Sequence, residues 1–209
     1  MATQMQPPAR PEQDPGFETK IQHLREAFSD APQMAKTALE NKAQELATHM
    51  SEPRSRMESA GRIGSRQGTV SELTLILTFA PGGARRLRAL LKAQNGNFTA
   101  ADKVSTLHDM RFVFLDNDTK AIFATAYDGD WDTYIDDFAT MIPDDMDVAF
   151  SAFEGWPGIY SLKVKDWIAS HQVTAEGWYV ANPDLTVRDA RRLKSVGKAV
   201  EAFLDKINN

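Results

Sequence analysis

The sequence has 209 residues, 42% of them hydrophobic, and a net charge of −5 at neutral pH. This length suits one main hydrophobic core with extensions. The composition excludes a membrane-spanning run, disulfides and thiolate ligands, since no long apolar stretch and no Cys are present. It also lacks the basic excess that broad nucleic-acid binding needs. Met1–Pro15 has no apolar signal-peptide region. We therefore expect a cytoplasmic protein with neither a membrane nor a nucleic acid as partner.

The first 52 residues predict a tail followed by a helical arm. Residues 1–16 contain four Pro and no periodic apolar pattern, which predicts a disordered tail. Over residues 17–52 the apolar positions recur at spacings of three and four, with a break at Pro32, which predicts two helices or one kinked helix. Such a narrow stripe cannot form its own core, so we expect the arm to pack on the domain, on a partner chain or on a second copy.

Residues 53–70 have the composition of an exposed linker. They combine Ser and Gly with a single acid, Glu58, and several basic residues: Arg54, Arg56, Arg62 and Arg66. An anion-binding clamp is the second interpretation of these Arg residues. The sequence favours a solvated tether, because the chain is acidic and no aromatic residues alternate with the basic ones.

Residues 71–158 predict an α+β domain with a ferredoxin-like βαββαβ antiparallel sheet. Alternating apolar residues predict the strands, and spacings of three and four predict the helices. The predicted order is a strand over 72–79, a helix that opens at Pro81-Gly82-Gly83, hairpin strands over 107–115 and 121–127, a helix over 131–142, and a fourth strand over 147–153.

Residues 159–209 predict a C-terminal helical extension that packs on this domain. It contains a helix over 162–171, a short segment over 177–181, and a final helix with Thr186 as N-cap. The final helix has an apolar stripe at helical spacing: Val187, Ala190, Leu193, Val196, Val200, Phe203 and Ile207.

Both faces of the predicted sheet carry large apolar residues. On the strand over 107–115, Met110, Phe112 and Phe114 alternate with Val113 and Leu115. A face of this kind is stable only when it is covered. The two helices cover one face, and a second subunit or the C-terminal extension is expected to cover the other. The sequence therefore predicts an enclosed apolar compartment and a homo-oligomer.

The central domain resembles the dimeric α+β barrel superfamily, which includes the dye-decolorizing peroxidases, the chlorite dismutases and the antibiotic-biosynthesis monooxygenases. The element order carries this resemblance over residues 71–158, together with four segments: Pro81-Gly82-Gly83, His108 through Arg111-Phe-Val-Phe114, Phe123-Ala-Thr-Ala-Tyr-Asp-Gly129 and Tyr134-Ile-Asp-Asp-Phe138. The Gly-x-x-Asp-Gly motif of the dye-decolorizing peroxidases is not matched, because Tyr127-Asp128-Gly129 lacks the earlier glycine.

The resemblance implies an apolar small-molecule ligand, with haem as the cofactor of some branches. It then implies an axial ligand from His171 or His108 and a catalytic role for Arg111 with Asp109. The residues also allow a plainer interpretation of both histidines. His171 would cap carbonyl groups at the end of its helix, and His108 would form a hydrogen bond at the end of the sheet.

A branch without a cofactor would need only an apolar pocket with a few polar groups. The substrate-pocket candidates are Tyr127, Trp131 and Phe112. The acids Asp128, Asp130 and Asp132 imitate the start of a calcium loop, but Thr133 and Ala139 stand where the loop needs Gly and Glu. They are better explained as N-terminal acids of the following helix, and we expect no metal site.

Three functions from different classes remain open. The first is an oxidoreductase that depends on haem, peroxide or oxygen. The second is a non-catalytic module that binds a ligand in the same pocket. The third is an oligomeric scaffold in which the helical arm and the linker mediate assembly with partners.

Overall fold

The computed structural model describes residues 15–49, 57–96 and 98–207. The chain divides into a helical unit within residues 1–54 and an α+β unit within residues 55–209. The predicted tail, residues 1–16, lies outside the described residues except for Pro15 and Gly16, which begin the first helix. None of the helices in the described ranges is long and apolar enough to cross a membrane.

The helical unit is a pair of helices, α1 (Pro15–Ala27) and α2 (Gln33–His49). The chain breaks between them at Pro32, as the sequence predicts. The sequence predicts that the arm forms no core of its own, but the two helices share a small one, which consists of Phe17, Ile21 and Ala43. Arg25 donates two hydrogen bonds to Glu40, at 2.9 and 2.7 Å, and so connects the two helices on the surface.

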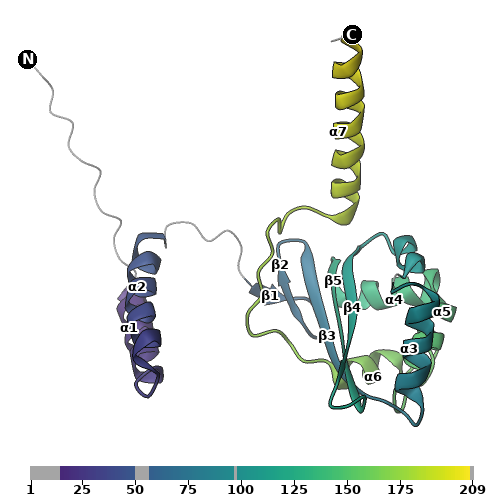
Figure 1. The fold of residues 1–209 in the computed structure, drawn as a ribbon, viewed down its shortest axis with the longest axis horizontal. Helices are drawn as coiled ribbons and strands as arrows, with labels where there is room; N and C mark the ends of the chain where they lie inside the picture. Colours follow the sequence, from purple (N-terminus) through teal and green to yellow (C-terminus); the bar gives the residue numbers. More distant parts are fainter. Residues whose placement is uncertain (1–14, 50–56, 97, 208–209) are drawn as a thin grey trace, which may run out of the picture. The chain divides into compact units, whose positions relative to one another are not determined.

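The larger unit contains one five-stranded antiparallel sheet with the strand order β1-β2-β3-β5-β4 (Figure 1). The strands are β1 (Met57–Ser59), β2 (Ser65–Gln67), β3 (Val70–Thr78), β4 (Leu107–Leu115) and β5 (Lys120–Asp128). The structure confirms the predicted strands β3, β4 and β5. Their apolar residues alternate with the period of a strand, which is why the sequence indicated them. The domain is therefore α+β with an antiparallel sheet.

The prediction of a linker over residues 53–70 is wrong for its described part. Residues 57–67 form the β1–β2 hairpin, in which Ala60, Ser65 and Gln67 are buried. The Gln67 amide donates to the carbonyl of Trp178. Backbone pairing, which leaves little trace in the composition, holds these two short strands at the edge of the sheet. The composition of this segment, which is rich in Ser, Gly and Arg, therefore did not indicate strands β1 and β2.

Four helices pack on one face of the sheet (Figure 1). They are α3 (Gly83–Ala93), α4 (Trp131–Met141), α5 (Pro143–Phe150) and α6 (Val164–His171). A short 3-10 helix over Thr99–Lys103 precedes β4. The core beneath them is rich in aromatic rings, and Phe150 alone lies 5.0–6.4 Å, between ring centroids, from Phe112, Phe123, Phe153, Trp156 and Trp167.

The predicted fourth strand, residues 147–153, is wrong, and the ferredoxin-like βαββαβ order is therefore incomplete. This segment lies in α5 and the turn after it, and only Phe153 forms an isolated bridge, with Phe79. The residues of its first turn and the spacing of its buried side chains explain why this segment is helical. Pro143 stands at its N-terminal position, Asp144 and Asp145 follow, and the buried side chains of Met146, Ala149 and Phe150 recur at helical spacing.

The second face of the sheet is only partly covered. Residues 172–186 run past it towards α7 (Val187–Ile207), with Val173 donating to the Thr74 carbonyl at 2.8 Å and Thr69 donating to the Pro183 carbonyl at 2.8 Å. Farther along the strands, Ile76 is 44% exposed and Val113 is 42% exposed. The expected apolar residues are therefore present on both faces, but the single chain covers the second face only in part.

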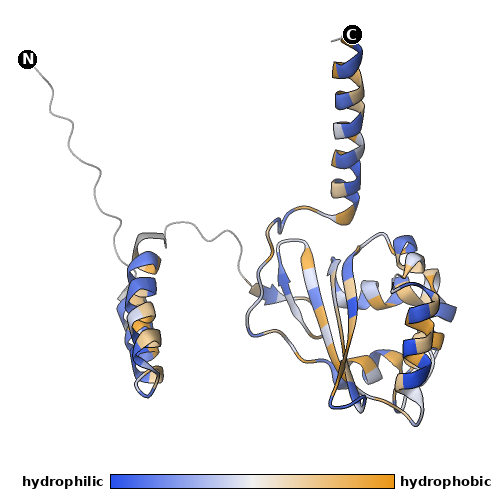
Figure 2. Ribbon diagram, viewed as in Figure 1, coloured by the Kyte–Doolittle hydropathy of each residue, from blue (hydrophilic) through white to orange (hydrophobic). Residues whose placement is uncertain are grey.

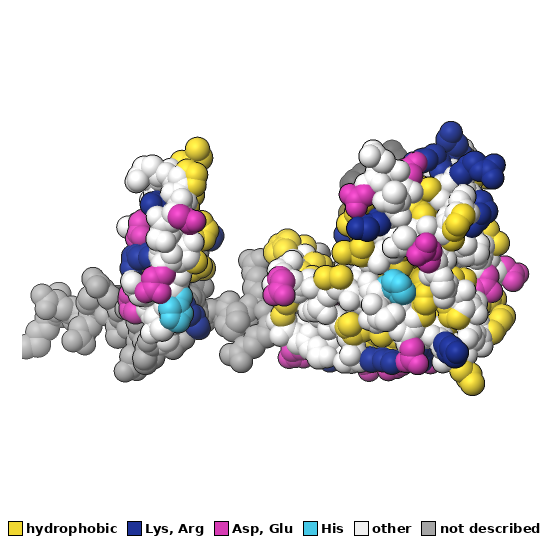
Figure 3. Space-filling model, turned by 90° about the horizontal axis from the view of Figure 1, so that it is seen from below, with side chains coloured by type: hydrophobic (Ala, Val, Ile, Leu, Met, Phe, Trp, Pro, Cys, Tyr) yellow, Lys and Arg dark blue, Asp and Glu magenta, His cyan; other side chains and the backbone are white. Residues whose placement is uncertain are grey.

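The final helix, α7, begins as the sequence predicts, because the Thr186 hydroxyl accepts the Asp189 N–H at 3.1 Å. The sequence also predicts that the extension packs on the domain, and α6 does so through Val164 and Ile168. In α7 only Val187 is buried, and residues 188–207 are all exposed. Figure 2 shows that hydrophobic and hydrophilic residues both occur along the length of α7. On the face of the larger unit drawn in Figure 3, hydrophobic side chains also lie among charged ones.

Candidate functional site

A pocket of about 290 Å³ lies on the second face of the sheet. We call it the sheet-face pocket. Its floor comes from β3, β4 and β5, and its wall comes from the segment that leads into α7. Most of its lining is apolar or aromatic, which is typical of small-molecule sites. The lining residues are Val70, His108, Asp109, Ala126, Trp178, Tyr179, Val180, Ala181, Asn182, Leu185 and Ala190.

Strand register explains why the floor residues meet. Val70 of β3 pairs with Asp128 of β5, and Glu72 pairs with Ala126. Residues two positions apart in a strand point to the same face, so Val70 and Ala126 share a face of the sheet. Asp109 lies directly opposite Ala126 on β4. This face is opposite the helices, which pack on Leu73, Leu75 and their neighbours.

His108 reaches this face through an irregularity in β4. The register shifts between Leu107 and Asp109, so His108 is an extra residue in the strand. Bulges of this kind redirect a side chain, and they are common next to active sites. The imidazole is 27% exposed at the pocket.

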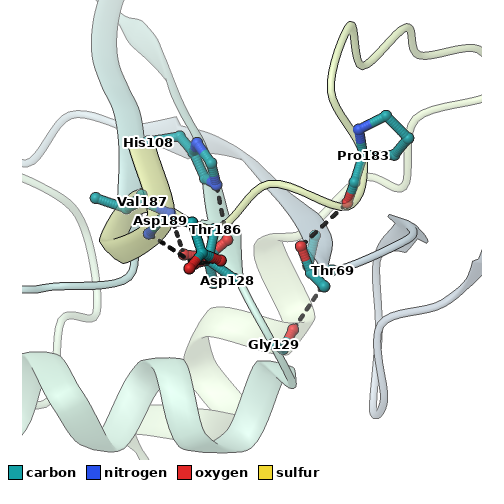
Figure 4. Close-up of polar contacts among 9 residues, drawn as sticks. Thr69, His108, Asp128, Gly129, Pro183, Thr186, Val187 and Asp189 are labelled. Atoms are coloured by element: carbon teal, nitrogen blue, oxygen red, sulfur yellow. Dashed lines mark hydrogen bonds and ion pairs between the residues drawn. The ribbon is translucent and has the colours of Figure 1, made fainter. Parts of the chain in front are cut away.

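Asp128 holds the imidazole in place (Figure 4). Its Oδ1 lies 2.7 Å from His108 Nε2, and its Oδ2 accepts the backbone N–H of Val187 at 2.8 Å. Asp128 therefore connects the imidazole with the N-terminus of α7, where the helix dipole favours a carboxylate. When Nε2 donates to Asp128, the neutral ring offers Nδ1 as a hydrogen-bond acceptor.

The wall of the pocket is fixed at one end by Thr69 and Pro183 (Figure 4). The Thr69 hydroxyl and backbone N–H both donate to the Pro183 carbonyl, at 3.0 and 2.8 Å. Gly68 permits this close approach, because a Cβ atom at Gly68 would lie 2.4 Å from the Pro183 oxygen. Gly68 also has a φ of +61°, which a glycine adopts without strain.

Of the predicted catalytic pair, Asp109 lines the pocket and Arg111 lies beside it. Arg111 donates to Asp109 at 2.6 Å, and both side chains are more than half exposed. The structure therefore brings Asp109 and His108 into one pocket, with Arg111 next to them on the same strand.

The three predicted pocket residues, Tyr127, Trp131 and Phe112, lie elsewhere. Tyr127 stacks on Tyr134 with ring centroids 3.7 Å apart, and Trp131 is fully buried and donates to Gln172 at 2.8 Å. Phe112 lines a small void of about 20 Å³ within the aromatic core. Burial raises the pKa of the Tyr127 hydroxyl well above its ordinary value, with the charge of Glu72 as the next cause. These residues belong to the helix face.

His171 lies apart from the sheet-face pocket, at the end of α6. Its Nδ1 bonds to the Trp167 carbonyl at 2.7 Å, and its ring lies 4.3 Å from the Trp167 ring. The plainer interpretations of both histidines are thus confirmed: His171 caps a helix carbonyl, and His108 forms a hydrogen bond at the end of the sheet.

The residues around the sheet-face pocket do not fit a haem in the single chain. The pocket volume lies at the lower end of the range for small-molecule sites, roughly 300–1,000 Å³. Its lining includes His108 but not His171. It therefore has room for a molecule of one or two rings rather than a tetrapyrrole.

The acids at the start of α4 form ion pairs. Asp130 occupies the N-cap position, but its carboxylate accepts from Arg66 at 2.7 Å. Asp132 pairs with Lys165 at 3.1 Å, whereas Asp128 contacts His108 and the start of α7 rather than α4. Within the described ranges, no cluster of three His, Cys, Asp or Glu side chains is placed to hold a metal ion.

Sequence reasoning missed the wall of the pocket and the role of Asp128. Residues 177–181 stood out only as a short apolar segment, although Trp178 and Tyr179 are the kind of aromatic residues that line binding sites. The sequence places Asp128 with the acids of the following helix, and its contact with Val187 leaves no local pattern because the two residues are 59 positions apart.

No protein-family model matches the sequence, and neither a curated protein nor a solved structure is significantly similar to the chain. The physical properties of the pocket therefore carry the functional argument.

Proposed function

We propose that this protein binds a small organic molecule in the sheet-face pocket. The observation that carries the proposal is an apolar and aromatic cavity of about 290 Å³ with a carboxylate-supported histidine, His108, in its lining. Apolar walls supply affinity, and a few fixed polar groups supply orientation. Asp128 fixes one ring nitrogen of His108, so the histidine is oriented before a ligand arrives.

The lining favours an aromatic molecule with a hydroxyl group. Trp178, Val70 and Leu185 offer apolar surface to a ring. His108 Nδ1 and the Asp109 carboxylate are acceptors, so they favour a group that donates a proton. A phenol or naphthol has both properties and suits the volume of the pocket.

A titration with 2-naphthol tests this proposal. The fluorescence of Trp178 should change on binding, and the change should disappear in Trp178→Phe. Ala126→Trp fills the floor of the pocket and should abolish binding, whereas Val148→Ala, at an exposed position of α5, should leave it unchanged. Equal binding by wild type and Ala126→Trp would refute the proposal.

We propose further that a second copy of the chain covers this face, as in a dimeric α+β barrel. Ile76, Ile122 and Val113 form one cross-strand row in the register of β3, β5 and β4. Ile76 and Val113 are 44% and 42% exposed in the single chain. A partner sheet would bury this row, and it would also extend the walls of the sheet-face pocket.

Catalysis is a second candidate function, and the His108–Asp128 pair is the observation that favours it. A histidine supported by a carboxylate can act as a general base. At His108 the imidazole would remove the hydroxyl proton of a bound 2-naphthol and become an imidazolium. C1 of the naphtholate would then form a bond to molecular oxygen, and the imidazolium would return the proton to give a hydroperoxide. Cleavage of the O–O and C1–H bonds would release water and 1,2-naphthoquinone, so that one naphthol and one O2 give one quinone and one water. Oxygen consumption in the presence of 2-naphthol, lost in His108→Ala, is the expected result.

A haem-dependent oxidoreductase, implied by the family resemblance, stays a prediction with its own test. The purified protein would show a Soret band after haem addition, and His108→Ala or His171→Ala would remove it. The small volume around His108 favours the opposite result, a protein without a Soret band, unless a second subunit enlarges the pocket.

A further inference from the structure

In the described part of the chain, the contacts of α7 with the domain lie between Val187 and Arg191, at the start of the helix. The Val187 side chain is buried and its N–H donates to Asp128 at 2.8 Å. The Thr186 hydroxyl and the Asp189 carboxylate lie 2.5 Å apart and complete the cap. Arg191 adds an ion pair with Asp102 at 3.6 Å. The remaining turns of this 21-residue helix, about 30 Å long, lack buried side chains.

The exposed turns carry a continuous apolar face. At 100° per residue its large side chains, with Ala190 and Gly197, span an arc of about 140°. They are exposed by 50–62%: Leu193, Val196, Val200, Phe203, Leu204 and Ile207. An apolar face of this width in water needs a partner surface.

The opposite face of α7 is basic. The helix contains six Lys or Arg residues against three acids, so its net charge is +3, whereas the net charge of the whole chain is −5. One of the three acids, Asp189, is used by the helix cap. Positive charge is therefore concentrated next to the apolar face, on a chain that is otherwise acidic.

We propose that α7 binds to an anionic lipid surface, with its apolar face in the membrane interface and its basic residues at the head groups. An apolar face of bulky residues with a Lys and Arg-rich opposite face is typical of helices that lie in the plane of a membrane. Such a helix needs one apolar face rather than an apolar circumference. Charge complementarity selects the anionic surface as the occupant.

A coiled coil with α7 of a second copy fits these residues less well. Leu193, Val196, Val200, Phe203 and Ile207 would form its seam, which is about two heptads long, whereas such coils usually need three or four. The positions flanking that seam contain Arg192 and Lys206 but no acid, so the two helices would repel each other. The apolar arc is also wider than a seam.

Vesicle flotation of the full chain tests the proposal. The wild-type protein should float with vesicles of phosphatidylcholine and phosphatidylglycerol at low salt. It should bind about tenfold less to phosphatidylcholine alone, and less to the mixed vesicles at high salt. Phe203→Glu places a charge on the apolar face and should lower binding about tenfold or more. Ala202→Glu makes the same change of charge on the exposed opposite face and should lower it only about twofold.

Three results would overturn the proposal. The first is the absence of binding to the anionic vesicles, and the second is an equal loss of binding for Phe203→Glu and Ala202→Glu. The third is a drop in molar mass for Phe203→Glu by light scattering in the absence of lipid, because it would show that α7 binds a second copy. Neither variant touches the sheet-face pocket, so naphthol binding provides a separate check that the domain is folded.

Discussion

The two faces of the sheet differ in what they do for the molecule. The helix face is filled by α3 to α6 and an aromatic cluster, and a void near Phe112 has a volume of only about 20 Å³. The other face has a pocket of about 290 Å³ and an exposed apolar row. A tightly packed face provides stability, and a partly covered face provides binding surface. The same three strands supply both.

The largest expected effect is on the helix face. Phe150→Ala removes a ring that contacts five aromatic neighbours, so it should lower the free energy of unfolding by about 3–5 kcal/mol. Urea denaturation measures this loss. Val148→Ala, on the exposed side of the same helix, should change stability by about 0.5 kcal/mol or less. Similar losses for the two variants would contradict the placement of α5.

On the second face, a charge should break association rather than folding. Ile76→Asp places a carboxylate in the exposed row of the sheet, so it should convert a dimer into a folded monomer. Light scattering gives the mass, and circular dichroism shows that the fold is retained. Met141→Asp, at an exposed apolar position on α4, should leave the mass unchanged. A wild-type protein that is already monomeric would exclude the dimer.

The affinity of the pocket for naphthol should depend on Asp128, which orients His108, as well as on His108 itself. Asp128→Asn removes the charge that orients the imidazole, and its amide can no longer accept from both His108 and Val187. We expect naphthol affinity to fall about tenfold, as for the loss of one hydrogen bond to a charged group. Calorimetric titration measures the change. Unchanged affinity would show that Asp128 serves only to anchor α7.

The stacked tyrosines should differ in the cost of losing a hydroxyl. The Tyr134 hydroxyl lies 2.7 Å from the Thr125 hydroxyl, whereas the Tyr127 hydroxyl is buried without a hydrogen-bond partner among the described residues. Tyr134→Phe should therefore cost about 1 kcal/mol, and Tyr127→Phe should be neutral or slightly stabilising. Thermal unfolding compares the two variants, and the reverse order would be inconsistent with this geometry.

The smallest effect is a loss of stability at alkaline pH. Burial raises the pKa of both Tyr127 and Tyr134 above the unfolded value near 10. The folded state therefore binds more protons there, so this contribution is complete below about pH 10 and is lost as the pH rises further. Tyr127→Phe should flatten the decline in stability above that pH. The same slope in wild type and variant would show that other groups cause it.

The sequence predicted the strands and helices with strong periodicity. The alternation in residues 107–115 and the helical spacing of Trp131, Tyr134, Ile135 and Phe138 each match one structure only. Residues 147–153 form a short apolar segment that fits a strand or a helix. Pro143 favours the helix, because it stands at the N-terminal position of α5. Residues 57–67 have no apolar pattern, because their pairing uses backbone groups.

The sequence analysis named only some of the residues that line the sheet-face pocket. His108 and Asp109 do line the pocket, but Tyr127, Trp131 and Phe112 lie on the helix face. Alternation shows which residues share a face, but it does not show which face the helices cover. The wall residues Trp178 and Asn182 come from a segment that is more than 50 positions from the floor in sequence, so only tertiary structure brings them to His108.

The binding of 2-naphthol, followed by NMR with labelled alanine and histidine, tests the central claim most directly. Signals of His108, Ala126 and Ala181 should shift in a saturable manner, and those of Ala149 and Ala152, which are buried in the core on the helix side of the sheet, should not. Shifts confined to the helix face, or no shift at His108 and Ala126 at saturating naphthol, would contradict the claim that the second face of the sheet is the binding face.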